Sequence, residues 1–461
     1  MQGVVKAMNK TKKTGYILGI SGLVVLLAFL GWVLTILFEG EQPRIRVELQ
    51  DDYLSGPRKV VVWAQDTRRG LRSMEVSLEQ EGRKVNLFET RFPFRGVFNR
   101  EGVRRFQKEI EVDPGALNLA QGQVDLTVTV LDYSRRRGGD GNLSVFRRRL
   151  IVDTVPPAVM PLSRMHYINR GGTGLVVYRA SSDTVESGVF VNRRFFKGFP
   201  YGGEKSRGYV CYFAVDDSLE SYPSIHLWAK DRAGNTARAS FNHRVRWKRF
   251  RKDRIHLTER FLKRVMMKFE ANSQEQGRDL ISRFLKINRE LRKENARFLE
   301  DLMKKTSPRK LWDGTWLRMK NAATMARFAD RRDYYYNGKR VDQQVHRGVD
   351  LASLAQSKVE AANSGKVLYA GELGIYGLVV VLDHGQGLAS LYGHLSSISV
   401  RPGQEVAKGQ ELGRTGSTGL AGGDHLHFSV LVGGVFVNPV EWWDPHWIRD
   451  NVTKKLALLQ G

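Results

Sequence analysis

The hydrophobic positions near the start of the chain form one unbroken run. Residues 17–38 (ILGISGLVVLLAFLGWVLTILF) contain no charged side chain, and as a helix they are long enough to cross a hydrocarbon core of about 30 Å. Four lysines precede the run, which places residues 1–16 in the cytoplasm by the positive-inside rule. A cleavable signal peptide has an apolar run of only about 7–15 residues and a small-x-small site, and FEGEQPR offers no such site. The pattern predicts an uncleaved single-pass anchor in the cytoplasmic (inner) membrane, with everything after it outside the cytoplasm.

The chain after the anchor alternates short β-rich runs with polar turns. VVVWAQDTRRGLRSMEV (60–76) and VVYRASSDTVESGVFV (176–191) share a β-branched run, an Ala, an Asp in a polar turn and a second alternating strand, a pattern typical of β-sandwiches. The Pro-Pro pair of VDTVPPA cannot continue a central strand, so we predict two sandwiches, at 43–152 and 153–250. VDTVPPA and AKDRAGN resemble recurring motifs of bacterial immunoglobulin-like (Ig-like) domains, and that resemblance implies spacing or binding rather than chemistry.

From about residue 250 the hydrophobic period becomes that of a helix. A first apolar stripe recurs every four positions, at Leu257, Phe261, Val265 and Phe269. SQEQ at 273–276 predicts a capping box that opens a second helix. We therefore predict a helical hairpin over 251–306. The hairpin either packs against a neighbouring domain or forms a coiled coil that binds a partner or a second copy.

After residue 310 glycines punctuate short β-rich runs such as GKVLYAG and YGLVVVLDHG. This pattern of short β-rich runs separated by glycines predicts a compact, mostly antiparallel β-domain at 311–445, followed by a C-terminal tail at 446–461. The predicted fold class is therefore multidomain and mainly β, with an N-terminal transmembrane helix, two Ig-like sandwiches, a helical hairpin and a C-terminal antiparallel sheet.

Six of the ten histidines lie in this last part of the chain. In VHRGVDLAS, His346 and Asp350 share a face if the segment is extended, and in GGDHLHFSV so do His425 and His427. Imidazoles with a carboxylate suit Zn²⁺, and a catalytic zinc centre has three protein ligands and an open fourth position. Each motif alone is weak, but His346, Asp350 and one histidine of the pair together predict a one-zinc centre that activates water. A structural zinc site usually favours cysteine, and Cys211 is far away in sequence.

Four motifs occur in a recognisable order over about residues 340–440: HRGVDLA, LYGHLS, GQEVAKGQELG and GSTGLAGGDHLHF. Together they resemble the LytM/lysostaphin family of zinc metallopeptidases. The resemblance implies a β-sheet cleft that carries zinc and cuts peptide bonds in peptidoglycan. It also implies that His346, Asp350 and His427 bind the metal, while His425 and its partner His394 form the catalytic pair that moves protons.

The charge and the cysteine content limit the partners and the redox chemistry. Lys and Arg number 74 against 48 Asp and Glu, a formal net charge of +26, which favours contact with a polyanion. The predicted topology disfavours nucleic acid as that polyanion, so the charge fits a protein between an anionic membrane surface and an anionic wall. Cys211, alone in the chain, excludes an internal disulfide, and we expect it to be a buried apolar residue.

The sequence thus predicts a membrane-anchored zinc metalloendopeptidase that hydrolyses peptide cross-links of peptidoglycan for cell-wall remodelling. One alternative is a catalytically silent regulator of the same fold that activates separate cell-wall amidases; the presence of all five site residues favours the enzyme. Another is an adhesin-like scaffold, which leaves the histidines unexplained. We expect cell-wall or division proteins to bind the sandwiches or the hairpin. From its position upstream of the site, the hairpin is expected to restrain activity.

Overall fold

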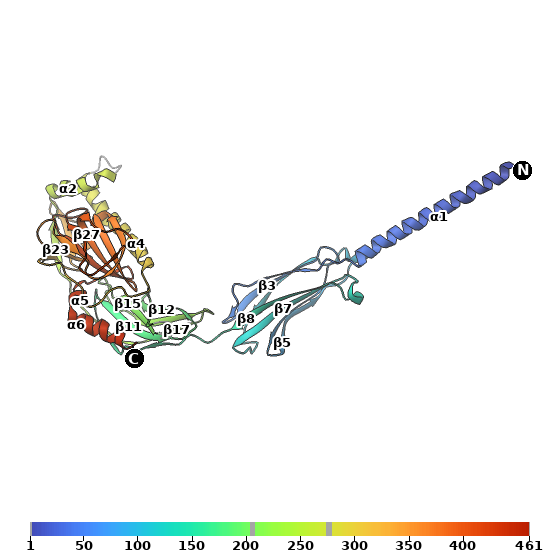
Figure 1. Cartoon of the computed structure of the whole chain (residues 1–461), viewed down its shortest axis with the longest axis horizontal. Helices are drawn as coiled ribbons and strands as arrows, with labels where there is room; N and C mark the ends of the chain where they lie inside the picture. Colours follow the sequence, from blue (N-terminus) through green and yellow to red (C-terminus); the bar gives the residue numbers. More distant parts are fainter. Residues whose placement is uncertain (1, 203–207, 273–278, 461) are drawn as a thin grey trace. The chain divides into compact units, whose positions relative to one another are not determined.

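The computed structural model describes residues 2–202, 208–272 and 279–460, and every structural statement below refers to these. The chain forms two compact units, Met1–Val155 with Arg232–Asn235 and Pro156–Asp231 with Thr236–Gly461. Both units consist mainly of β-strands (Figure 1), which confirms the predicted fold class. The finer division into the predicted domains stays a prediction.

The first unit begins with helix α1 (Gln2–Leu37). Its segment Tyr16–Leu37 is long and apolar enough to cross a membrane, and none of it is buried in the protein. The chain therefore carries one N-terminal apolar helix of the kind found in membrane anchors and signal sequences. An uncleaved anchor is the finer prediction.

Two sheets form the rest of the first unit, in the strand orders β1-β3-β6 and β2-β8-β7-β4-β5. Alternate residues of β3 and β7, such as Val60, Val62, Val124 and Leu126, are buried in one shared core, as expected for sheets with one face inward. The strands are β1 (Arg44–Glu48), β2 (Tyr53–Leu54), β3 (Arg58–Gln65), β4 (Leu71–Gln80), β5 (Arg83–Arg91), β6 (Arg105–Val112), β7 (Gly122–Asp132) and β8 (Leu143–Val152).

The second unit starts with two further sheets, ordered β14-β15-β11-β9 and β13-β12-β16-β17, and a short parallel pair β10-β18. Cys211 on β15 is fully buried, as expected for an apolar core position. The strands are β9 (Val159–Pro161), β10 (Met165–Asn169), β11 (Thr173–Ala180), β12 (Thr184–Val191), β13 (Arg194–Lys197), β14 (Phe199–Tyr201), β15 (Gly208–Ala214), β16 (Ile225–Asp231), β17 (Thr236–Ala239) and β18 (Asn242–Arg246).

The helical segment begins later than the sequence predicts. Residues Lys252–His256 form strand β19, which pairs with β21 (Arg331–Tyr336), because Ile255 and Leu257 follow the two-residue period of a strand. The helices are α2 (Glu259–Met266), α3 (Leu280–Lys286) and α4 (Arg292–Leu302), with a π-helical turn at Ile287–Leu291 between α3 and α4. The predicted capping box at 273–276 lies outside the described residues, and α3 is instead capped by the Asp279 side chain.

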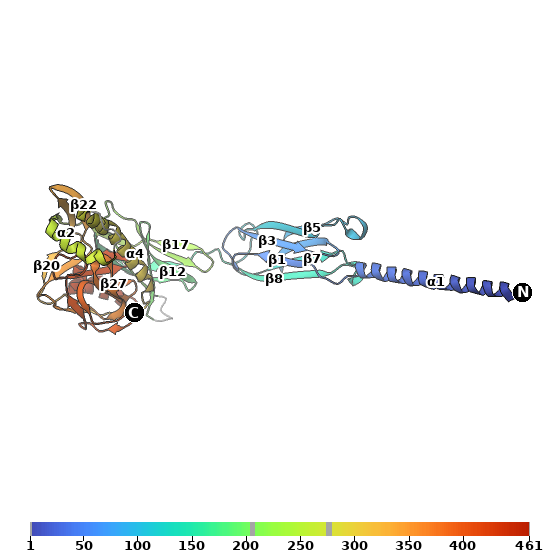
Figure 2. The same ribbon diagram turned by 90° about the horizontal axis from the view of Figure 1, so that it is seen from above.

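A ten-stranded sheet forms the C-terminal part, with the main order β20-β23-β30-β27-β26-β25-β28, and its neighbouring strands pair antiparallel. Figures 1 and 2 show α2 and α4 beside this sheet. Its strands are β20 (Ala323–Ala326), β23 (Val349–Ala352), β24 (Lys358–Glu360), β25 (Gly365–Glu372), β26 (Leu378–Gly385), β27 (Leu388–Ile398), β28 (Glu405–Val406), β29 (Glu411–Thr415), β30 (Leu426–Val432) and β31 (Val435–Val437); β22 (Lys339–Val345) pairs with β21 outside it.

The C-terminal helices tie the large sheet to the upstream sandwich. One hydrophobic core continues through both. Glu441 on α5 (Val440–Trp443) accepts hydrogen bonds from Asn169 Nδ2 and the Thr173 amide, both at 2.8 Å. Lys455 on α7 (Lys454–Ala457) donates to the Leu175 carbonyl at 2.9 Å. The C-terminal helices α5 and α7 therefore contain two buried ionisable groups, both docked beside β11.

The pH dependence of unfolding tests the buried Glu441. Burial raises its pKa from 4.5 to about 7 despite the bonds from Asn169 and Thr173, so the folded protein holds a proton that the unfolded chain releases. The stability from this group is complete below the unfolded pKa and is lost as the pH rises towards 7, by about 3 kcal/mol. Urea unfolding at several pH values gives the free energy of unfolding as a function of pH. Glu441→Gln should flatten the slope of that curve between pH 4.5 and 7, whereas the exposed control Glu405→Gln should keep it. A slope that Glu441→Gln leaves unchanged would contradict the assignment.

Candidate metal centre

The register of two neighbouring strands brings Asp350 and His427 together. Asp350 on β23 stands directly opposite His427 on β30, and residues opposite one another on antiparallel strands share a face. His425 lies one residue before β30, where it bridges to Gly416, and it lines the same cavity as His427. The prediction that the two histidines of GGDHLHFSV face one side agrees with this placement.

His346 lies in the loop between β22 and β23 rather than on a strand. Its backbone is held by hydrogen bonds with Ala329 and Asp330. The following Gly348 allows the loop to lie against β30, because a Cβ there would come within 2.6 Å of the Phe428 carbonyl oxygen and 2.7 Å of His427 Cε1. Glycine at this position is therefore required for His346 to reach the strand pair.

Three side-chain atoms meet at one point. His346 Nε2 lies 2.9 Å from Asp350 Oδ1 and 3.1 Å from His427 Nδ1, and the last two atoms are 2.9 Å apart. All three residues are at least nine-tenths buried. Tetrahedral ligands about 2.0–2.2 Å from a zinc ion lie roughly 3.4 Å apart, so the three atoms would need to move apart only slightly to form a zinc ligand set.

Hydrogen bonds to the opposite ring nitrogens fix which nitrogen of each imidazole can bind a metal. His346 Nδ1 donates to the Arg327 carbonyl at 3.0 Å, so Nε2 carries the lone pair. The Ser429 hydroxyl donates to the Arg347 carbonyl at 2.8 Å and therefore accepts from His427 Nε2 at 3.0 Å, which leaves Nδ1 unprotonated. Hydrogen-bond acceptors of this kind, on the ring nitrogen that does not face the metal, orient metal-binding histidines. Three electron-pair donors thus face one another, and a shared cation satisfies them.

Arg332 on β21 binds the other oxygen of Asp350, with a 3.2 Å bond from Nη2 to Oδ2. Burial alone would raise the pKa of Asp350, but the surrounding imidazoles of His346, His425 and His427 hold it well below its usual range. Asp350 is therefore a carboxylate at neutral pH. Burial also lowers the pKa of His427 to about 4, against the opposing pull of Asp350, which keeps that imidazole neutral as a ligand must be.

His425 and His394 flank the cluster, with ring centroids 4.9 Å apart. His425 Nδ1 donates to the Gly423 carbonyl at 2.9 Å, and its Nε2 lies 3.6 Å from Asp350 Oδ1. Burial acts to lower the pKa of His425. The contact with Asp350 and the negative charge of that carboxylate outweigh burial and raise this pKa above its usual value. Burial, together with the neighbouring imidazoles of His427 and His425, lowers the pKa of His394 well below its usual value. One flanking imidazole is thus basic and the other neutral.

His394 reaches this face only because the backbone turns there. In a regular strand it would share a face with Tyr392, which lines the cavity on the reverse side of the sheet. Its φ of +62° is in the left-handed region, at the point where β27 stops pairing with β30 and starts pairing with β29. Backbone strain of this kind is often found at functional sites.

The helical segment closes one side of the site. A cavity of about 250 Å³ holds the histidines and is also lined by Phe261 of α2, Phe284 of α3 and Arg292 of α4. Lys268, just beyond α2, donates to the carbonyls of Ser417 and Ala421 on the loop that leads to His425. The helices therefore restrict the space beside the candidate metal centre.

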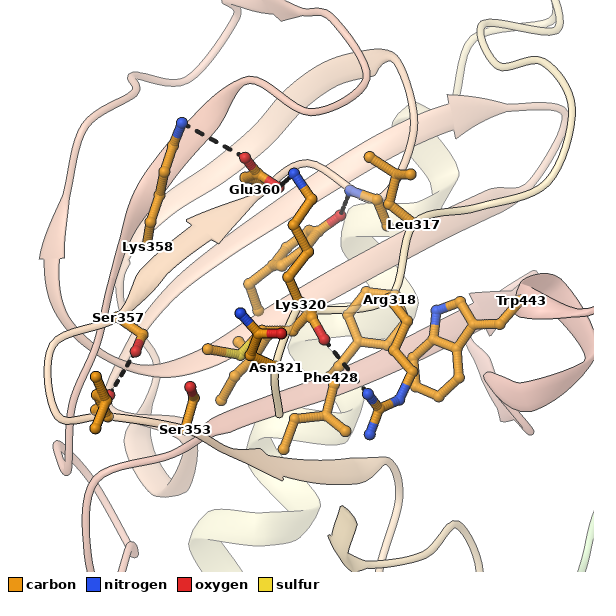
Figure 3. A pocket seen from close by; sticks show the side chains of 16 residues that line it. Leu317, Arg318, Lys320, Asn321, Ser353, Ser357, Lys358, Glu360, Phe428 and Trp443 are labelled. Carbon is orange, nitrogen blue, oxygen red and sulfur yellow. Dashed lines mark hydrogen bonds and ion pairs between the residues drawn. The ribbon is translucent and has the colours of Figure 1, made fainter. Parts of the chain in front are cut away.

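A larger cavity of about 550 Å³ lies on the reverse face of the same sheet (Figure 3). Leu351 and Phe428 line it, and these residues alternate along their strands with Asp350 and His427. Lys320 and Lys358 both pair with Glu360 at its edge. Its size is greater, but its lining has no histidine, so the chemistry belongs to the smaller cavity.

Known proteins are similar to the part of the chain that contains the candidate metal centre. Residues 344–439 match the model of peptidase family M23. Over 97 residues the chain is 38% identical to DD-carboxypeptidase/endopeptidase Mpg of Neisseria meningitidis, covering 21% of this chain and 22% of that protein. Over 96 residues it is 38% identical to the murein hydrolase activator EnvC of Escherichia coli, covering 21% and 23%. The chain thus spans under a quarter of the length of these relatives.

One solved structure is similar to this part of the chain. The catalytic domain of lysostaphin from Staphylococcus simulans is 29% identical over 27% of this chain and 92% of that domain, with a TM-score of 0.23. By the family match at residues 344–439, the C-terminal part of the chain is a domain of peptidase family M23. Its His346, Asp350 and His427 form a candidate metal site, whereas the Ig-like assignment of the upstream β-domains stays a prediction.

Several residues that orient the site belong to no sequence motif. Arg332 binds Asp350, and Ser429 binds His427. The carbonyl of Arg327 binds His346, and the carbonyl of Thr418 binds His394. Only Ser429 offered a signal, since it continues the two-residue period of His425 and His427. The others come from distant loops and strands.

Removal of the Ser429 hydroxyl should weaken metal binding. Ser429→Ala leaves His427 Nε2 without its acceptor, so the ring loses its fixed orientation and tautomer. We expect about a tenfold or greater loss in zinc affinity, measured by competition with a chromophoric chelator. Ser353→Ala, on the reverse face, serves as the control and should bind zinc like the unmodified chain. Equal affinities for the two variants would contradict the role given to Ser429.

Proposed function

We propose that the chain is a zinc metalloendopeptidase that hydrolyses peptide cross-links of peptidoglycan outside the cytoplasmic membrane, for cell-wall remodelling. The observation that carries this proposal is the meeting of His346 Nε2, Asp350 Oδ1 and His427 Nδ1 within 3.1 Å of one another. The M23 match of the surrounding residues supports the reaction class. That Mpg is described as a DD-carboxypeptidase/endopeptidase supports the peptide cross-link as the substrate.

The donor set fits zinc, with two imidazole nitrogens, one carboxylate oxygen and no competing sulfur. His346, Asp350 and His427 would hold the ion. A bound zinc ion supplies a Lewis acid and lowers the pKa of water. Arg332 keeps Asp350 oriented by binding its second oxygen. The M23 match and the chemistry of the donors are the grounds for this assignment.

His425 and His394 are assigned the proton transfers. Because His425 Nδ1 is held by the Gly423 carbonyl, its Nε2 faces the cavity and can take a proton from the attacking water and return it to the leaving amine. His394 Nδ1 is held by the Thr418 carbonyl at 2.8 Å, so its Nε2 can hold a hydrogen bond beside His425. A basic imidazole next to a neutral one suits one proton acceptor and one hydrogen-bond partner.

The alternative is a catalytically silent activator of separate amidases. It is supported by the similarity to EnvC, which is described as a murein hydrolase activator, and by the helices that line the site. The enzyme is favoured because all five residues of the constellation are present and three of them form a buried donor cluster. The partners proposed are peptidoglycan, the inner membrane through α1, and cell-wall or division proteins through the upstream β-domains or the helical segment.

Incubation of residues 40–461 with purified peptidoglycan tests the proposed reaction. We expect new muropeptide fragments in mass spectrometry from the zinc-loaded protein. Asp350→Ala and His425→Ala should each lower the rate about 100-fold or more, the first by losing metal and the second with zinc still bound. His384→Ala, a buried histidine outside the site, is a control for nonspecific effects of losing an imidazole. Folded, zinc-loaded protein that releases no fragment would favour the activator.

We further propose that the helical segment restrains access to the centre. Lys268→Met keeps the side-chain length but removes both hydrogen bonds to the loop before His425. We expect hydrolysis to rise several-fold, with the unfolding midpoint of the protein nearly unchanged because Lys268 is exposed. Lys263→Met on α2, which pairs only with Glu259 on the same helix among the described residues, is the matched control. Unchanged hydrolysis by Lys268→Met would contradict restraint by this contact.

A further inference from the structure

A second cluster of charged side chains lies in the first unit, far in sequence from the histidines. Glu39 follows α1 directly, Asp66 follows β3, and Asp132 ends β7. One oxygen from each of the three lies within 4.8 Å of the others. Asp66 and Asp132 are only 2% and 0% exposed. Three carboxylates this close, two of them buried and Glu39 half-buried, repel one another unless a cation or protons neutralise them.

Asp66 has an oxygen that no donor reaches. Its Oδ1 accepts from the amides of Arg68 and Gly70, at 3.1 and 2.5 Å, in its own turn. Its Oδ2 is buried and has no hydrogen-bond partner in the part of the chain that the structure describes. A buried carboxylate oxygen without a partner is costly, and this oxygen belongs to a group already next to two other carboxylates. It is an open ligand position.

Backbone amides donate to two of the carboxylates, from Ser134 and Asn142 to Asp132 Oδ1 and from Glu41 to Glu39 Oε2, but no donor among the described residues reaches Asp66 Oδ2. Arg69 is buried beside it, but its bonds go to the carbonyls of Tyr133 and Phe98, at 3.3 and 2.8 Å. Asn142 Nδ2 lies 2.8–3.3 Å from four oxygens: Glu39 O, Glu39 Oε1, Glu41 O and Asp132 Oδ2. An amide nitrogen has two hydrogens for these four acceptors. Asn142 Nδ2 therefore cannot satisfy all four of these oxygens.

We propose that Glu39, Asp66 and Asp132 form a calcium site that fixes the segment after the apolar helix to the first sandwich. Ca²⁺ takes six to eight oxygen ligands in flexible geometry at about 2.3–2.6 Å, and carboxylates with nearby carbonyls provide that chemistry. Zinc is a poor fit, since no nitrogen or sulfur ligand belongs to the cluster. Glu39 is tied to the sandwich through its carbonyl, which accepts from Ser134 Oγ at 2.8 Å and from Asn142 Nδ2. A bound cation would add its carboxylate to the same connection.

The test uses the full chain in detergent micelles, stripped with EDTA, reloaded with one equivalent of zinc and titrated calorimetrically with CaCl₂. We expect one Ca²⁺ per chain with a Kd between about 1 μM and 1 mM. Asp66→Asn should weaken binding at least about tenfold, because it replaces the unpartnered oxygen or its charge. Glu111→Gln, an exposed carboxylate of the same unit, should bind like the unmodified chain.

Thermal unfolding separates loss of the site from loss of the fold. Without calcium, Asp66→Asn should unfold at the same temperature or higher, since it removes repulsion and keeps an oxygen for Arg68 and Gly70. Saturating calcium should raise the midpoint of the unmodified chain by a few degrees and leave that of Asp66→Asn unchanged. If Asp66→Asn unfolds early without calcium, Glu39→Gln replaces it and should show the same loss of binding. No binding up to about 10 mM CaCl₂, or binding that neither variant weakens, would overturn the proposal.

Discussion

The C-terminal domain depends on one electrostatic constraint: three electron-pair donors meet at a buried point. His346 Nε2, Asp350 Oδ1 and His427 Nδ1 all lie within 3.1 Å of one another, and the outer nitrogens of both imidazoles are engaged elsewhere. Such a cluster is unfavourable on its own and favourable around a cation. Metal binding at this candidate site would therefore also stabilise the loops and strands that build it.

The scaffold around this point consists of a few backbone features. Gly348 lets a loop lie against β30, and the left-handed backbone of His394 turns a strand residue from one face of the sheet to the other. The cross-strand register of β23 and β30 sets Asp350 opposite His427. Each feature places one side chain, and together they separate the residues of the metal cluster from the pair His425 and His394 that we assign to proton transfer.

The part of the site that local periodicity determines was predictable. The two-residue period of a strand places His425 and His427 on one face, and the order of the four motifs identifies the domain that contains them. His394 shows the limit, because strand alternation alone places it on the wrong face and only the family motif connects it to the site. Arg332 and the carbonyls that fix the tautomers could not be predicted, since they reach the site through tertiary contacts. The start of the helical segment was wrong because Ile255 and Leu257 fit either period over so short a stretch.

X-ray absorption at the zinc K-edge of the zinc-loaded chain tests the central claim most directly, because it reports the metal's ligands without depending on substrate. Our account predicts two imidazoles and one carboxylate oxygen at about 2.0–2.2 Å, plus one further light atom. The spectrum should change with His427→Ala and stay the same with His425→Ala. A spectrum that His425→Ala alters and His427→Ala does not, or a centre without imidazole ligands, would contradict it.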